Sequence, residues 1–165
     1  MSEGAPLDEI EALYHAGLDR FVRTAAAITG SREAGRDAVQ DGFVTAIRKR
    51  GQFRGEGSVE AWLWSVIVTS ALKEARRGRQ RRRVDELPVE PASANGHERG
   101  ESAAFRAAVA QLPARQRTVV FLRYYADLEY EQIAAVLGIR RGTVSAALHA
   151  AHRTLRQHVS EAHEQ

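Results

Sequence analysis

Apolar residues recur at three- and four-residue steps through most of this chain, which is the spacing of one helical face. The repeat is longest over positions 7–28, where it predicts a helix whose apolar face comprises Leu7, Ile10, Leu13, Tyr14, Leu18, Phe21, Val22, Ala25 and Ile28. Gly30 is suitably placed to end this helix, and Ser31 to cap the next one. No stretch has a strand pattern, so the chain is predicted to be all-α.

A second helix is predicted over about 32–50, with two contrasting sides. One side is expected to be buried and carries Val39, Phe43, Ala46 and Ile47. The other side is a mixed stripe of Asp37, Gln40, Asp41, Val44 and Arg48. Taken from the residues alone, such a stripe is either a solvated face or a docking surface.

A third helix, about 59–77, follows a loop that contains Phe53 and Arg54 between several glycines. At about 100° per residue, one face of this helix groups Val59, Trp62, Leu63, Val66, Ile67 and Ser70. We therefore expect Trp62 in the core. Trp64 and Val68 fall off that face and need another partner, which for Trp64 is expected to be the first helix. Phe53 is expected to fill the core, whereas Arg54 is free to contact a ligand.

The chain is predicted to form two small helical domains joined by a flexible linker. The first domain covers residues 1–83 and ends in a dense arginine cluster, Arg76 to Arg83. Residues 84–102 contain Pro88, Pro91 and an excess of acidic side chains without helical periodicity, which is typical of a linker. Residues 103–165 form the second domain, in which helices are expected over 103–111 and 113–125.

The second domain contains the pattern of a helix-turn-helix. Ile133, Val136 and Leu137 form one apolar face, and Gly138 follows where the first helix must end. Val144 and Leu148 then restart a helical face that is expected to continue to about position 159. In a DNA-binding helix-turn-helix the second helix lies in the major groove. The same pattern also fits a purely structural corner.

Composition narrows the function classes. The chain has 165 residues, a net charge of +3 and no cysteine, which excludes disulfides and thiolate metal sites. It has no membrane-length apolar run and no visible signal peptide, so we expect a cytoplasmic protein without membrane insertion. His149 and His152 lack further ligands at suitable spacing, so neither a metal nor another cofactor is expected. Without a nucleophile and base, we expect no enzyme and no small-molecule substrate.

The second domain resembles the C-terminal domain of bacterial sigma factors. The matching positions are Leu112-Pro113, Gln116-Arg117, Leu122-Arg123-Tyr124, Tyr130-Glu131-Gln132-Ile133-Ala134, Leu137-Gly138-Ile139, Gly142-Thr143-Val144 and Leu155-Arg156. The first domain resembles the family's other domain through Asp37-Ala38-Val39-Gln40-Asp41-Gly42-Phe43, Phe53-Arg54-Gly55, Ala61-Trp62-Leu63-Trp64 and Arg76-Arg77. Two such domains joined by a short linker are similar to the extracytoplasmic-function type of sigma factor.

The resemblance implies partners and site residues. It implies that the protein binds core RNA polymerase and promoter DNA, is restrained by an anti-sigma protein, and threads its acidic linker along the polymerase RNA path. Core binding would fall to Asp37, Gln40, Asp41, Val44 and Arg48. The minus-ten element would be met by Phe53, Arg54, Ser65, Thr69, Lys73, Arg76 and Arg77. The minus-thirty-five element would be met by Arg115, Arg140, Arg141, Thr143, Ser145, His149 and Arg153.

The chain departs from the family pattern in two places. An arginine and an asparagine are common in the family where this chain has Val68 and Thr69. The second helix of the helix-turn-helix carries Ser145, Ala146, Ala147 and Ala150 where basic residues are usual. Two other interpretations stay open at this point: a helix-turn-helix regulator that acts without polymerase, and an RNA- or ribosome-binding module that uses the arginine cluster. The first of these leaves the stripe on the second helix unexplained.

Overall fold

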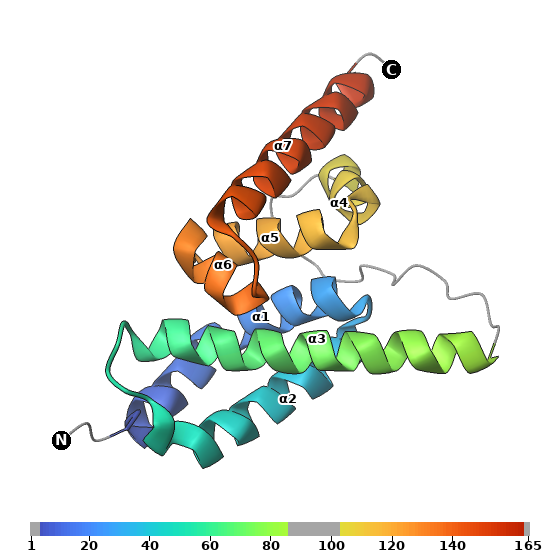
Figure 1. Cartoon of the computed structure of the whole chain (residues 1–165). Coiled ribbons are helices and arrows are strands. Elements are labelled where there is room, and N and C mark those ends of the chain that lie inside the picture. The colour runs from blue at the N-terminus through green and yellow to red at the C-terminus, as the bar shows by residue number, and fades with distance from the viewer. Residues whose placement is uncertain (1–3, 86–102, 164–165) are drawn as a thin grey trace. The chain divides into compact units, whose positions relative to one another are not determined.

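The structure, a computed structural model, describes residues 4–85 and 103–163, and these form two compact units. The first unit contains α1, α2 and α3, and the second contains α4 to α7 (Figure 1). The described ranges contain α-helices and one short 3-10 turn but no strand. The prediction of an all-α chain with two helical domains is thus confirmed.

α1 (Leu7–Thr29) and α2 (Arg32–Lys49) meet at a tight junction that the sequence predicts correctly. Gly30 adopts the left-handed conformation with φ 86°, and its N–H donates to the carbonyl of Ala26. Glycine takes this conformation without the steric cost that a Cβ brings. Ser31 then caps α2 by accepting a hydrogen bond from the Ala34 N–H at 3.0 Å.

The end of α2 anchors the start of the chain. A 3-10 turn, η1 (Arg50–Gln52), follows α2 and receives the N-terminal segment. The backbone N–H of Ala5 donates to the Arg50 carbonyl at 2.8 Å, and Ala5 itself is buried. Gly4 and Ala5 line a recess of about 540 Å³ together with Ile47 and Arg48.

α3 (Val59–Asp85) is longer than predicted. Ser58 caps its start, because the Ser58 side chain accepts a hydrogen bond from the Ala61 N–H at 3.1 Å. Its C-terminal turns extend beyond the ends of α1 and α2 (Figure 1). Positions 84 and 85, which we expected in the linker, are therefore helical, and the remainder of the predicted linker lies outside the described residues.

The core of the first unit is centred on the side of α3 that faces α1 and α2. Its members on α3 are all almost fully buried: Leu63, Trp64, Ile67, Val68 and Ala71. Trp64 packs against Phe21 of α1 with ring centroids 4.3 Å apart, as expected. The prediction for Trp62 is wrong, because it is only half-buried, as are Val66 and Ser70. Because both α1 and α2 pack against α3, the buried side of α3 includes Trp64 and Val68, which lie off the predicted apolar face.

Four residues of the predicted apolar faces are exposed, including Ile47, which we expected to be buried. Ile47 of α2 has 45% of its surface exposed, and Leu7, Tyr14 and Leu18 of α1 are exposed to a similar degree. The helical periodicity is correct at these positions, but no described element covers this edge of the α1–α2 pair. The exposed apolar side chains form a surface that is described below.

In the second unit, α4 (Ala103–Gln111), α5 (Ala114–Tyr124) and α6 (Tyr130–Leu137) all contact α7 (Arg141–His163). The core includes Leu112, Val119, Leu122, Ile133, Val144, Leu148 and Ala151. Pro113 is the N-cap of α5, so the helix begins at Ala114, one position after the predicted start. α7 continues to His163, slightly beyond the predicted end.

The helix-turn-helix is formed by α6 and α7. Glu129 and Gln132 make a capping box that fixes the start of α6. Gly138 ends α6 in the left-handed conformation with φ 64°, as predicted, and the Ile139 N–H donates to the Ala134 carbonyl at 3.0 Å. Arg141 is the first residue of α7.

Candidate functional site

The stripe on α2 faces solvent, as the sequence predicts. Asp37, Gln40, Asp41, Val44 and Arg48 are all exposed, and we refer to these five residues as the docking face. Among the described residues, the two aspartates and Arg48 have no ion-pair partner within the protein. Val44 is a large apolar side chain with 48% of its surface exposed. Unpaired charges beside an exposed apolar side chain can interact with a partner surface of mixed character.

A groove of about 740 Å³ runs between α1 and α2 beside the docking face. Gln40 and Val44 of the docking face line it, together with Ile47 and the exposed Leu7, Tyr14 and Leu18. The exposure of these four residues, Ile47, Leu7, Tyr14 and Leu18, was not predicted from the sequence. For Ile47 a signal was available, because it lies three residues after Val44 and seven after Gln40. Contiguous exposed apolar surface of this kind usually marks an interaction site.

The loop before α3 contains two candidate residues, Phe53 and Arg54, which differ in burial. Phe53 is half-buried, with its ring centroid 5.7 Å from that of Trp62. Arg54 is exposed, and the following Gly55 and Gly57 both have positive φ angles. Phe53 therefore does not fill the core as we expected; like Trp62 it is only half-buried, and the two rings form an aromatic surface.

A polar stripe on α3 lies opposite the core. Ser65, Thr69, Lys73 and Arg76 fall within an arc of about 80°, and the structure thus places these predicted residues on one face. The Ser65 hydroxyl donates to the Trp62 carbonyl at 2.6 Å, and the Thr69 hydroxyl to the Ser65 carbonyl at 2.7 Å. Trp62 lies in the same arc, so the stripe gains an aromatic residue that we had assigned to the core.

The arginine cluster at the end of α3 is partly neutralised. Glu74 lies 3.8 Å from both Arg77 and Arg81, measured between carboxylate oxygens and guanidinium nitrogens. Arg76 and Arg79 are exposed and have no such partner among the described residues. These two arginines, together with Lys73, are therefore the described cations on this part of α3 that are most available to phosphate groups.

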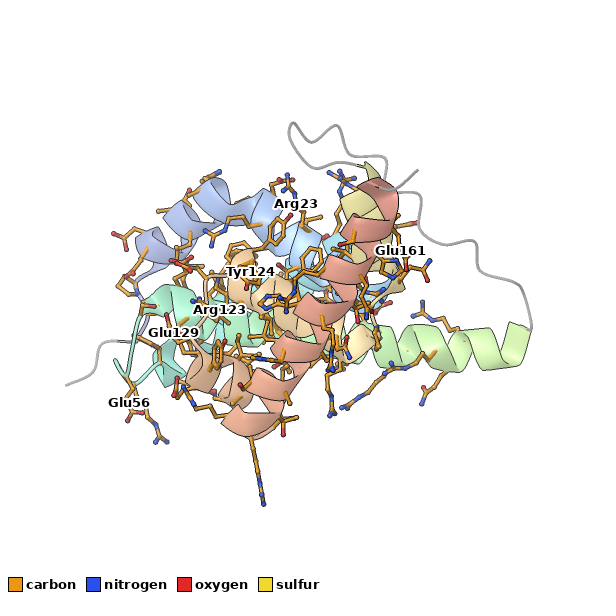
Figure 2. The ribbon with its side chains drawn as sticks, turned by 90° about the horizontal axis from the view of Figure 1, so that it is seen from above. Arg23, Glu56, Arg123, Tyr124, Glu129 and Glu161 are labelled. Carbon is orange, nitrogen blue, oxygen red and sulfur yellow. The ribbon has the colours of Figure 1, made fainter. Side chains whose placement is uncertain are left out.

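Polar contacts also fix the position of α5 against α6 and α7. The Arg123 guanidinium donates to the Leu128 carbonyl at 3.4 Å and lies within 4.0 Å of the Asp127 and Glu129 carboxylates (Figure 2). The Tyr124 hydroxyl is hydrogen-bonded to Nε2 of His152 on α7 at 2.7 Å. Arg115, a predicted DNA contact, is exposed in the first turn of α5.

The predicted residues of α7 are not all on one face. Ser145, His149 and Arg153 share an arc of about 80°, whereas Thr143 lies about 160° from Ser145 and is half-buried. Arg140 is exposed and precedes the helix. Arg141 donates from Nε to the Glu131 carboxylate at 2.6 Å, and its guanidinium carbon lies 5.5 Å from the centre of the Tyr130 ring. This pair could not be predicted from the sequence.

The described residues contain no helix long and apolar enough to cross a membrane. Within the same residues, no group of three or more histidine, cysteine, aspartate or glutamate side chains could hold a metal ion.

Two family models match the chain, one in each unit. Residues 13–82 match sigma-70 region 2, and residues 102–155 match sigma-70 region 4. The chain belongs to the sigma-70 family of RNA polymerase sigma factors. It is therefore an alternative sigma factor, which directs promoter recognition together with RNA polymerase. Sigma factors are regulatory proteins rather than catalysts.

Individual relatives agree with this assignment. The sigma factor is 25% identical over 166 residues to RNA polymerase sigma factor YlaC of Bacillus subtilis, with 96% of each chain covered. It is 28% identical over 166 residues to ECF RNA polymerase sigma factor SigE of Mycolicibacterium smegmatis, covering 95% of this chain and 64% of that protein. These likenesses confirm the predicted extracytoplasmic-function type.

A solved structure confirms the fold. The sigma factor aligns with RpoE of Bartonella quintana, crystallised in complex with the anti-sigma factor NepR, at a TM-score of 0.80 and 22% sequence identity. The alignment covers 93% of this chain and 98% of that chain.

Proposed function

We propose that the sigma factor binds core RNA polymerase through the docking face on α2 and the adjoining groove. The observation that carries this proposal is the exposure of Val44 and Ile47 beside Asp37 and Asp41, which have no ion-pair partner among the described residues. Aspartates supply charge complementarity to a basic partner, and the apolar side chains supply area that leaves water on binding. If the docking face were only a hydrated surface, its charged residues would be explained, but the exposed apolar side chains of the adjoining groove would not be.

The minus-ten element is assigned to the surface formed by the Arg54 loop and the polar stripe of α3. Trp62 and Phe53 offer aromatic faces for unstacked bases, which are worth roughly 1–3 kcal/mol each in single-strand binding. Ser65 and Thr69 offer hydroxyl oxygens, while Lys73, Arg76 and Arg77 are suited to phosphates. Val68 is fully buried, so it cannot provide the polar contact that the family commonly has there.

The minus-thirty-five element is assigned to the start of α7 in the major groove. Ser145, His149 and Arg153 face the duplex from one side of α7, and Arg140 and Arg141 from its N-terminus. Arg115 reaches the DNA backbone from α5. Thr143 is best explained as a residue that packs at the helix start rather than as a base contact, since it is half-buried on another side.

An anti-sigma protein is a further proposed partner. The support is the RpoE structure, which was solved with the anti-sigma factor NepR, together with the exposed groove between α1 and α2. Such a protein would compete with core polymerase if it covered the docking face. Because polymerase works in the cytoplasm, we place the sigma factor there as well.

Reconstitution with core polymerase tests the docking face. We expect the purified chain to give promoter-specific run-off transcription, and Asp41→Lys to weaken binding to core polymerase about tenfold or more, since one interfacial ion pair is worth roughly 1.5 kcal/mol or more. The matched control is Glu161→Lys, which makes the same charge change on α7 (Figure 2). Both variants should keep the circular dichroism of the wild type.

Two outcomes would contradict the proposal. Wild-type affinity of Asp41→Lys for core polymerase would show that the docking face is wrongly assigned. Tight operator binding by the free chain, without any effect on transcription by polymerase, would favour a regulator that acts alone.

A further inference from the structure

Arg141, the first residue of α7, is held by two neighbours from α6. Its Nε donates to Oε1 of Glu131 at 2.6 Å, and its guanidinium lies over the Tyr130 ring, 5.5 Å from the ring centre. Carboxylate and ring together restrain a long side chain that would otherwise sample many rotamers. The three residues come from both helices of the helix-turn-helix, and we refer to them as the Arg141 clamp.

The Arg141 clamp is a poor candidate for a stabilising device. The side chains of Arg141 and Glu131 are 63% and 67% exposed, and exposed ion pairs contribute little to folding free energy. The start of α6 is already fixed by the Glu129 and Gln132 capping box. What the clamp does provide is a defined direction for one guanidinium group.

The remaining donors of Arg141 suit a base edge. Only Nε is occupied, and neither Nη group has a hydrogen-bond partner among the described residues. A guanine presents two acceptors, O6 and N7, in the major groove, and a guanidinium contacts both at once. The first residues of a recognition helix are those that reach base edges.

The other arginines of α7, Arg153 and Arg156, lie more than three turns beyond the start of the helix, whereas the first residues of a recognition helix are those that reach base edges. Further along α7, Ala146 and Ala150 can offer no more than methyl contacts to bases. Arg140 is exposed one residue before the helix, and its side chain has no polar partner among the described residues. An unrestrained cation of this kind is suited to a phosphate group rather than to a base.

We propose that Arg141 recognises one guanine in the minus-thirty-five element, and that Glu131 and Tyr130 are positioning residues that aim its guanidinium at that base. This inference rests on the proposed placement of α7 in the major groove. The ionisation of Glu131 is in keeping with it. A hydrogen bond from its own backbone N–H and a second from Arg141 hold the pKa of this carboxyl below its ordinary value, so the pair is charged at neutral pH.

The test uses holoenzyme reconstituted from core polymerase and the full chain. The probe is a pool of duplex DNA with a fully randomised central segment, from which wild type and variants each select bound sequences. Base preference at every position is read from the selected pools, and the salt dependence of binding is measured on the preferred wild-type sequence. Specific selection by the wild type is the check on the proposed function itself.

We expect Arg141→Ala to lose the preference for guanine at one base pair by about tenfold or more, with other positions unchanged. Glu131→Gln should weaken the same preference severalfold and leave the salt slope unchanged, which a purely structural role would not do. Tyr130→Phe keeps the ring and should behave as wild type. Arg140→Ala should weaken binding to all sequences alike and lower the salt slope by about one unit.

Two results would overturn the inference while leaving the proposed function intact. One is uniform weakening by Arg141→Ala with a reduced salt slope, which would make Arg141 a phosphate contact. The other is an unchanged base preference for Glu131→Gln, which would remove the positioning role. Failure of wild-type holoenzyme to select any upstream sequence would instead count against the placement of α7 in the major groove.

Discussion

Gly138 and Gly142 lie four residues apart in the helix-turn-helix, but their backbones have opposite requirements. Gly138 has φ 64° and ends α6, whereas Gly142 lies inside α7 with helical geometry. A Cβ added at either position would meet open space. Any difference between substitutions at the two sites therefore arises from backbone conformation and not from packing.

We expect Gly138→Ala to lower the local free energy of unfolding of α6 and α7 by about 1 kcal/mol, because alanine is strained in the left-handed region. Gly142→Ala should raise it by about 0.5–1 kcal/mol, since alanine restricts the unfolded chain and favours helix. Hydrogen exchange of the α6 and α7 amides in the full chain measures both effects. Equal effects of the same sign would contradict this explanation of the turn.

At the scale of elements, α3 combines two tasks on opposite sides. The side with Trp64, Ile67 and Val68 forms the core with α1 and α2. The side with Ser65, Thr69 and Lys73 is the proposed minus-ten surface. Because the two sides are separate, stability and promoter opening should respond to different substitutions on the same helix.

We expect Ile67→Ala to destabilise the first unit by about 2–5 kcal/mol through loss of burial and creation of a cavity. Thr69→Ala, on the exposed side, should change stability by less than about 0.5 kcal/mol but reduce the fraction of promoter that opens. Tryptophan fluorescence during urea unfolding reports on the first unit, because both tryptophans lie there. Permanganate reactivity of unpaired thymines reports promoter opening. Loss of opening by Thr69→Ala only in proportion to lost stability would refute the division of tasks.

Local signals predicted the ends of elements well and their buried sides less well. Gly30, Ser31 and Gly138 act through their own backbone and near neighbours, so their roles could be predicted from the sequence. The exposure of Ile47, the partial exposure of Trp62 and the full burial of Trp64 depend on which helices cover α2 and α3. Periodicity identifies an apolar face, but it does not tell which tertiary partner, if any, covers that face.

The site shows the same limit. The exposed stripe on α2 could be predicted because all its residues belong to one helix, so helical periodicity alone places them on the same side. The contact between Glu131 and Arg141 crosses a turn, joins partners ten positions apart in the sequence, and depends on the angle between α6 and α7. Glu131 lies in a motif of the family and Arg141 was predicted to contact DNA, but only the folded geometry brings the two side chains together.

At the scale of the whole molecule, two units share one task. Each has its own core, and each has its own proposed contact with promoter DNA. When two binding units are joined, the second binds as an intramolecular step at high effective concentration. The affinity of the holoenzyme for promoter DNA should therefore depend on the chain connection as well as on the two DNA-binding surfaces.

A protease site inserted among residues 86–102 tests the importance of that connection. We expect holoenzyme assembled from a chain that was cut beforehand to bind promoter DNA about a hundredfold more weakly than holoenzyme with the same chain left uncut. The uncut chain controls for the insertion itself. Equal affinities would mean that one unit carries the DNA binding alone. Competition against a labelled promoter duplex provides the measurement.

The anchoring of Ala5 to Arg50 has a practical consequence for handling this protein. Gly4 and Ala5 share a recess with Ile47 and with Arg48 of the docking face. A purification tag or fluorescent label attached just before Gly4 would emerge beside the surface that is proposed to meet polymerase. A label placed after His163 would be attached at the C-terminal end of α7, whereas the proposed DNA contacts begin at the N-terminal end of this helix. Assays of holoenzyme assembly are therefore better built on chains labelled at the C-terminal end.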